Sequence, residues 1–112
     1  MPGKFEVKKT SNGQFVFNLK AANNEIILSS ETYTTRRGAV RGTESVKKNA
    51  GNAARFEKKA AKNGEHYFIL KASNGKQIGR SEMYNTAASM ENGIESVKKN
   101  APDAPTVDLT AG

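Results

Sequence analysis

Hydrophobic and polar residues alternate along the first part of the chain. Phe5 and Val7 alternate with charged neighbours, and after Asn12-Gly13 the alternation resumes through residues 15–21. A period of two is that of a strand with one buried face. Asn-Gly between two such runs predicts a hairpin with a type I′ turn, because both residues tolerate a positive φ. A second turn at Asn23-Asn24 leads into a third apolar run, so the pattern predicts a three-stranded meander.

The period then changes to that of a helix. Thr34 or Thr35 in the first half and Asn85 or Thr86 in the second are suitable N-caps. The buried stripe, spaced by three or four residues, is formed by Ala87, Met90, Ile94, Val97 and Ala101, with Ala39, Thr43, Val46 and Ala50 as its earlier counterpart. The sequence therefore predicts a helix after each meander.

The whole pattern is duplicated with a shift of 51 residues and no gap, so that residues 4–50 overlay residues 55–101. A unit of about 50 residues buries too little apolar surface to be stable alone, whereas about 100 residues can close a modest core. We therefore expect residues 1–112 to form a single domain of two repeats. Residues 106–110 alternate again at the position of a third first strand, which predicts a strand that completes the sheet at an edge.

Two doubled motifs connect the sequence to known proteins. Tyr-x-Thr precedes each helix at residues 33–35 and 84–86, and Gly-x-Glu-Ser-Val-Lys-Lys-Asn-Ala occupies residues 42–50 and 93–101. With these motifs the chain resembles the YegP-like family of small, mostly bacterial proteins of undetermined function. The resemblance implies an α+β fold of tandem βββ-α(-β) repeats with pseudo-two-fold symmetry. It further implies one shared antiparallel sheet with both helices on one face and exchanged C-terminal strands, and it supplies no catalytic residues to transfer.

Charge and composition narrow the classes of partner. The chain has 18 basic and 11 acidic residues, a net charge of +7 and no cysteine, which favours anionic partners and excludes disulfides and thiolate chemistry. Its longest apolar runs fall far short of the roughly 20 residues that span a bilayer, and its start lacks an apolar signal core. We expect a cytoplasmic protein without membrane association.

Few residues suggest metal or nucleophilic chemistry. His66 is the only histidine, and a zinc site needs three or four ligands, so we expect His66 at the edge of the core and no metal. Ser45 with Lys48, and Ser96 with Lys99, have the spacing of a Ser-Lys pair, but such a nucleophile requires a buried lysine. We expect these lysines to be solvated and paired with Glu44 and Glu95 four residues earlier. No catalytic residue and no cofactor is predicted.

Two further doubled features have competing interpretations. Ser30-Glu31 and Ser81-Glu82 precede the helices, where we expect them to fix the loop or cap the helix; acid-base chemistry would need both copies in one cleft, and related copies are expected to lie apart. Gly42 and Gly93 interrupt the helices at a cost of about 1 kcal/mol each. We expect them to allow the helices to approach each other, with close approach of a ligand as the alternative.

If both helices cover one face of the sheet, alternate strand residues present the other face to solvent. This face combines an apolar centre with lysines at matching positions of the two repeats. Its candidate partner-binding residues are Lys8, Val16, Lys20, Leu28, Lys59, Tyr67, Ile69 and Lys71. A second candidate surface is the first helix, where Arg36, Arg37 and Arg41 have no basic counterparts in the second repeat.

These observations favour a non-enzymatic binding or structural module that uses the open sheet face. Its partner is an unknown protein or a second copy of the chain, so both a monomer and a homodimer stay open. Binding of RNA or single-stranded DNA through the basic residues is the alternative, but single-strand platforms offer several exposed aromatics, and Tyr67 is the only credible one here. A small enzyme ranks third, because it would need a deep polar pocket.

Overall fold

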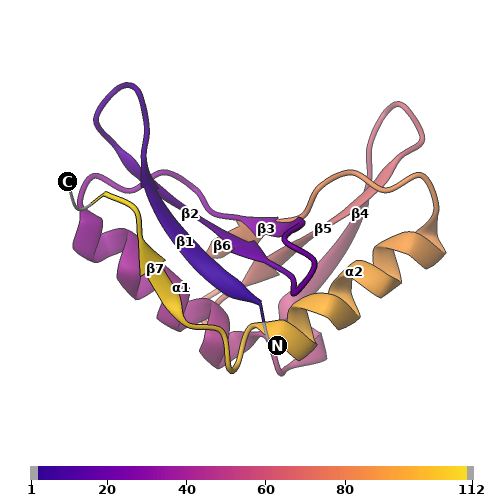
Figure 1. Cartoon of the computed structure of the whole chain (residues 1–112). Helices are drawn as coiled ribbons and strands as arrows, with labels where there is room; N and C mark the ends of the chain where they lie inside the picture. The colour runs from indigo at the N-terminus through magenta and orange to yellow at the C-terminus, as the bar shows by residue number, and fades with distance from the viewer. Residues whose placement is uncertain (1–2, 111–112) are drawn as a thin grey trace.

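The computed structural model describes residues 3–110 and joins both repeats in one seven-stranded sheet of order β4-β5-β6-β3-β2-β1-β7. Figure 1 shows a V, with one hairpin at the top of each arm and one helix along each arm. The elements are β1 (Lys4–Lys9), β2 (Phe15–Lys20), β3 (Ile26–Ser29), α1 (Arg36–Asn49), the 3-10 turn η1 (Ala53–Arg55), β4 (Phe56–Ala60), β5 (His66–Lys71), β6 (Gln77–Arg80), α2 (Ala87–Asn100) and β7 (Thr106–Asp108).

The predicted meanders and helix starts are confirmed. Thr35 and Thr86 are the N-caps, each accepting a hydrogen bond from the backbone N–H three residues later. The hairpin turns differ from the predicted type I′ geometry. In the first turn only Gly13 has a positive φ, of 86°, and its N–H bonds to Thr10 O while Thr10 N–H bonds to Gln14 O. This pattern is that of a three-residue hairpin loop that ends in a left-handed residue.

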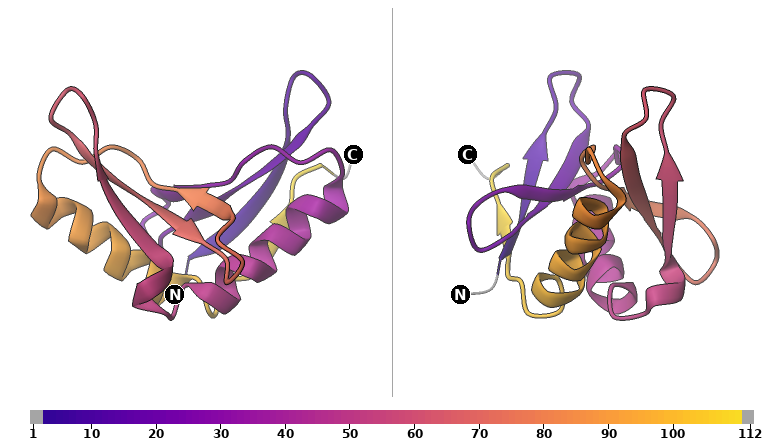
Figure 2. Two further views of the ribbon diagram at one scale, coloured as in Figure 1. Left: turned by 180° about the vertical axis from the view of Figure 1, so that it is seen from behind. Right: turned by 90° about the vertical axis from the view of Figure 1, so that its right-hand side faces the viewer.

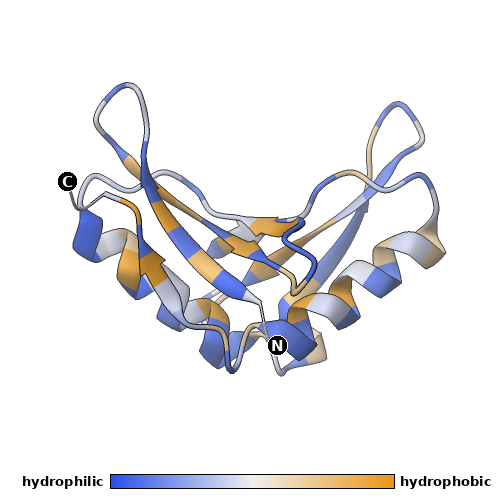
Figure 3. Cartoon of the chain, in the orientation of Figure 1, coloured by the Kyte–Doolittle hydropathy of each residue, from blue (hydrophilic) through white to orange (hydrophobic). Residues whose placement is uncertain are grey.

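The two repeats meet at a short seam in the middle of the sheet. β3 and β6 are antiparallel and pair through Ser29 and Arg80, so few backbone bonds join the halves at this seam. The helices compensate: α1 packs on β1 and β2 of its own repeat and on β5 and β6 of the other, and α2 packs on β5 and β3. One continuous apolar core results, with residues from both repeats. Figure 3 shows the alternation of hydrophobic and hydrophilic residues along the strands.

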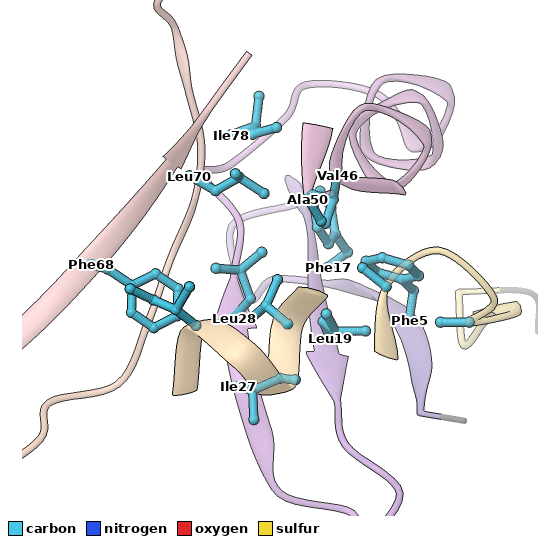
Figure 4. Packing of buried hydrophobic residues seen from close by; sticks show 14 of the residues in the cluster. Phe5, Phe17, Leu19, Ile27, Leu28, Val46, Ala50, Phe68, Leu70 and Ile78 are labelled. Atoms are coloured by element: carbon cyan, nitrogen blue, oxygen red, sulfur yellow. The ribbon is translucent and has the colours of Figure 1, made fainter. Parts of the chain in front are cut away.

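Leu28 closes this core at the pseudo-two-fold axis. It is fully buried, whereas the sequence predicted it on the open face, and that prediction is wrong. The register between β2 and β3 shifts after Leu19, so Leu28 lies opposite Leu19 and shares its buried face, while Ile26 lies opposite Lys20. Figure 4 shows Leu28 within the buried cluster, near Leu19 and Leu70.

The residue equivalent to Leu28 in the second repeat is Gly79. A Cβ built on Gly79 would lie 2.6 Å from a methyl carbon of Leu28, well inside van der Waals contact. Two leucines related by the pseudo-two-fold axis therefore cannot both fit. The repeats must differ at this position for the shared core to close.

The C-terminal strand β7 crosses from the second repeat to the first. It follows α2 but pairs with β1, with Phe5 opposite Thr106, and this pairing is parallel, so the shared sheet is mixed. An ion pair of 2.5 Å between Arg36 and Asp108 ties β7 to α1. At the other end of the sheet, β4 is an edge strand in which Lys58 replaces the buried Val7, and Lys58 pairs with Glu91 of α2. A charged residue that points inward discourages pairing at such an edge.

Gly42 and Gly93 were expected to let the two helices approach each other, and this prediction is wrong, because each glycine faces a tyrosine instead. A Cβ on Gly42 would lie 2.5 Å from Tyr33 Oη and 2.6 Å from the Phe17 ring, and one on Gly93 would overlap the Tyr84 hydroxyl. Each glycine thus accommodates the tyrosine of its own Tyr-x-Thr motif. Burial raises the pKa of both tyrosine hydroxyls.

Neither helix within residues 3–110 has the length and apolar character that crossing a membrane requires.

We predict that Gly93→Ala lowers the free energy of unfolding by about 1–3 kcal/mol, because the new methyl group overpacks the site of the tyrosine. If helix propensity alone decided the outcome, Gly93→Ala would raise the free energy of unfolding by about 1 kcal/mol. Gly51→Ala is the matched control, since a Cβ there meets no atom within 4 Å. Chemical denaturation measures both variants, and adding Tyr84→Phe to Gly93→Ala should restore part of the loss. A gain in stability for Gly93→Ala would contradict this assignment.

Candidate functional site

Both repeats contribute equivalent residues to the open face of the sheet. Because Phe5, Val7, Phe17 and Leu19 point into the core under the helices, the alternate residues point away from it. The open face consists of Lys4, Glu6, Lys8, Val16, Asn18, Lys20, Ile26, Ser29, Glu57, Lys59, Tyr67, Ile69, Lys71, Gln77 and Arg80. Six of these side chains are basic and two are acidic, so the face is positively charged.

Glu6 organises the lysines of the first repeat. Its carboxylate lies 2.9 Å from Lys20 Nζ, 3.4 Å from Lys4 Nζ and 3.8 Å from Lys8 Nζ, and the residue is 7% exposed. The hydrogen bond from Lys20 lowers the pKa of the Glu6 carboxyl most, against the opposing effect of burial. Glu6 is therefore an anion held by three cations.

Glu57, the equivalent of Glu6, organises a second cluster. Its two oxygens lie 2.8 Å from Lys59 Nζ and 2.5 Å from Lys71 Nζ. These two hydrogen bonds lower the pKa of Glu57 to about 2, and the bond to Glu57 raises the pKa of Lys59. The duplication thus places a glutamate with its lysines on each half of the face.

The centre of the face is less charged. The guanidinium of Arg80 lies 5.2 Å from the centre of the Tyr67 ring, as in a cation-π contact, and Asn18 Nδ2 donates to Ser29 Oγ at 2.9 Å. Ile69 on the same face is only 5% exposed. Tyr67 is therefore engaged by Arg80 rather than standing free.

Most of the predicted partner-binding residues share this face, but not all. The members that the structure places together are Lys8, Val16, Lys20, Lys59, Tyr67, Ile69 and Lys71, whereas Leu28 lies in the core. Arg36, Arg37 and Arg41 are exposed on α1, in the layer behind the sheet, and Figure 2 shows that layer from two further sides. Arg80 also lies on this face but could not be predicted from the alternation of β6, because a second register shift follows Leu70.

The two Ser-Glu pairs lie together, contrary to the expectation that they would be apart. Ser30, Glu31, Ser81 and Glu82 line a cleft of about 320 Å³ beside the seam, because β3 and β6 meet there. Each serine hydroxyl accepts a hydrogen bond from a backbone N–H of the second strand of its repeat, at 2.8 Å and 3.0 Å. It donates to the carbonyl of the glutamate that follows it. The serines therefore fix the loops that precede the helices, which is one of the structural roles predicted for them.

The remaining candidates have structural partners. His66 forms a backbone bridge with Tyr84, through two hydrogen bonds of 2.7 Å. The Ser45 and Ser96 hydroxyls accept hydrogen bonds from the side chains of Asn49 and Asn100.

The predicted ion pairs four residues apart are replaced by pairs three residues apart, Glu44 with Lys47 and Glu95 with Lys98. Within residues 3–110, no three His, Cys, Asp or Glu side chains are grouped so as to hold a metal ion.

Comparison with known proteins agrees with this architecture. The family model for a domain of unknown function, DUF1508, matches twice, at residues 10–57 and 61–108. The chain is 54% identical to a UPF0339 protein of Bordetella pertussis over 98% of both chains. It is 50% identical to UPF0339 protein YegP of Escherichia coli over 98% of this chain and all of that protein.

Two solved structures have the same fold. The solution NMR structure of YegP from Escherichia coli superposes with a TM-score of 0.92 at 50% identity, over 97% of this chain and 94% of that one. The solution NMR structure of a UPF0339 protein from Shewanella oneidensis gives a TM-score of 0.92 at 49% identity, over 97% and 92%.

We predict that Glu57 makes the stability of the fold depend on acid. Because the folded pKa of about 2 lies below the ordinary value of 4.5, the carboxylate stabilises the fold above pH 4.5, and this contribution is lost as the pH falls toward 2. Glu57→Gln should lower the urea midpoint at pH 7 and make its fall between pH 5 and 2 shallower. Glu82→Gln is the control, since Glu82 is in none of the ion pairs among residues 3–110. Parallel pH profiles for wild type and Glu57→Gln would contradict the prediction.

Proposed function

We propose for this chain, which belongs to the DUF1508 family of domains of unknown function, a non-enzymatic role as a binding module. Its open face would dock an acidic surface of a partner protein. The observation that supports this most is the duplicated cluster of lysines around Glu6 and Glu57. A face with a net positive charge steers a negatively charged partner toward it and fixes the orientation of that partner.

A protein partner suits this face better than a single-stranded nucleic acid. Platforms for single strands stack successive bases on several exposed aromatics, whereas this face has Tyr67 alone, with Arg80 against its ring. The half-buried Val16 and Ile26 give a mildly apolar centre inside a charged rim, which is the usual arrangement of a protein interface.

A second copy of the chain is a less suitable occupant of the same face. In a two-fold dimer the same surface faces itself, and six basic against two acidic side chains would then repel. We therefore propose a different, acidic protein as the partner and no dimer through this face. The cytoplasmic location and the absence of catalysis stay predictions from the sequence.

We predict that an acidic polypeptide distinguishes the open face from the helix layer. Poly-glutamate is the probe, and Lys8→Glu with Lys59→Glu should weaken its binding about tenfold. Arg37→Glu with Arg41→Glu makes the same change in net charge on α1 and should change binding less than about twofold. Isothermal titration at low salt measures the affinities, after melting curves have shown that both variants are folded.

Three outcomes would overturn the proposal. Equal losses in the two variants would show that only net charge matters. If poly-glutamate does not bind even at low salt, the proposal of an acidic protein partner is ruled out. Tighter binding of a single-stranded RNA than of poly-glutamate, with loss of that binding in Tyr67→Ala, would establish the nucleic-acid alternative instead.

A further inference from the structure

A pair of related grooves lies away from the open face, where each helix ends beside a turn of the other repeat. The first groove, of about 280 Å³, lies between the end of α1, the turn η1 and the β5–β6 turn, and Figure 2 (left) shows that turn beside the end of α1. The polar and charged residues that line it include Lys48, Asn49, Asn52, Arg55, Ser73 and Asn74. The second groove lies at the equivalent place, between the end of α2 and the β2–β3 turn.

The amides of the first groove are oriented by the backbone. Asn52 Oδ1 accepts from Ala54 N–H at 2.9 Å, and Asn74 Oδ1 accepts from Lys76 N–H at 3.0 Å. Since the oxygen of each amide is engaged, the group that each can offer a ligand is its NH2. Asn49, only 8% exposed, is fixed by its bond to Ser45 O at 2.8 Å. The NH2 group of Asn49 is thus used within α1, on Ser45 O and Oγ, and the oriented donors of the groove are Asn52 and Asn74.

The charge of the first groove is wholly positive. Lys48 and Arg55 line it, no carboxylate does, and neither cation is in any of the ion pairs among residues 3–110. The end of α1 carries the negative pole of the helix dipole. Two of its last four carbonyls are nevertheless occupied, Val46 O by Ala50 N–H and Asn49 O by Asn52 N–H.

The second groove has the same framework and the opposite charge. Asp103 stands at the position of Asn52, Glu95 joins the lining, and Lys99 is the only cation there. No basic residue takes the place of Arg55, because the residue 51 positions later is Thr106. The duplication therefore provides an internal comparison, in which only the first groove suits an anion.

We propose that the first groove binds the phosphate group of a small phosphorylated molecule. Two cations and two amide NH2 groups match the charge and the several acceptor oxygens of a phosphate dianion better than they match a single carboxylate. The volume of about 280 Å³ is just below the usual range for ligand pockets, which suits a small molecule. This site is separate from the open face and does not depend on the function proposed for it.

Inorganic phosphate is the probe, and two-dimensional ¹H–¹⁵N NMR is the readout. Titration of the full chain should shift the side-chain NH2 signals of Asn52 and Asn74 and saturate, while sodium chloride at equal ionic strength should not. The NH2 signal of Asn23 in the second groove should stay in place. Asn52→Asp keeps an acceptor for Ala54 N–H but adds a negative charge, so phosphate binding should weaken at least about tenfold. Asp103→Asn in the second groove is the matched control and should leave that binding unchanged.

The proposal fails if both grooves respond equally, if chloride reproduces the shifts, or if Asn52→Asp binds phosphate as the parent chain does. It also fails in its present form if a single-stranded RNA shifts these signals while inorganic phosphate does not. That result would assign the groove to a nucleic-acid backbone. A melting midpoint of Asn52→Asp close to that of the parent chain confirms that a loss of binding does not come from unfolding.

Discussion

The structure depends on closing one apolar core across a pseudo-two-fold axis where only one large side chain fits. Leu28 occupies that place, and Gly79 provides the space for it. The seam between β3 and β6 contributes little backbone pairing, so the halves are held together by this packing, by helices that cover strands of both repeats and by the pairing of β7 with β1. Burial of apolar surface is the dominant favourable term in folding, and neither repeat can complete its burial alone.

The same asymmetry extends outward from the axis. β7 covers β1 at one end of the sheet and is tied to α1 through Arg36 and Asp108, whereas β4 at the other end has Lys58 in place of a buried valine. The grooves at the helix ends have also diverged in charge, with Asn52 in one and Asp103 in the other. The open face, by contrast, keeps a glutamate with its lysines in both halves. We infer that binding at the open face would depend on residues that both repeats share, whereas binding in the first groove would depend on residues that differ between the repeats.

Local patterns predicted the elements well, because strand alternation, helix spacing and N-caps are properties of neighbouring residues. They failed where the answer depends on contacts across the sheet. Leu28 was placed on the wrong face because a one-residue shift in register reverses the direction of every later side chain. The partner of Gly93 was missed because the tyrosine that fills its space belongs to another element, and the meeting of the Ser-Glu pairs follows from a seam that the sequence does not mark. For the candidate site, the lysines were found, but Arg80 and its contact with Tyr67 were not.

Exchanging the two residues at the axis tests the shared core most directly. Leu28→Gly alone should cost about 2–5 kcal/mol through a cavity, and Gly79→Leu alone should cost about 1–3 kcal/mol through overpacking. The double variant carries one leucine at the axis from the opposite repeat, so its free energy of unfolding in urea should exceed that of either single variant. A double variant whose loss equals the sum of the two single losses would contradict the account.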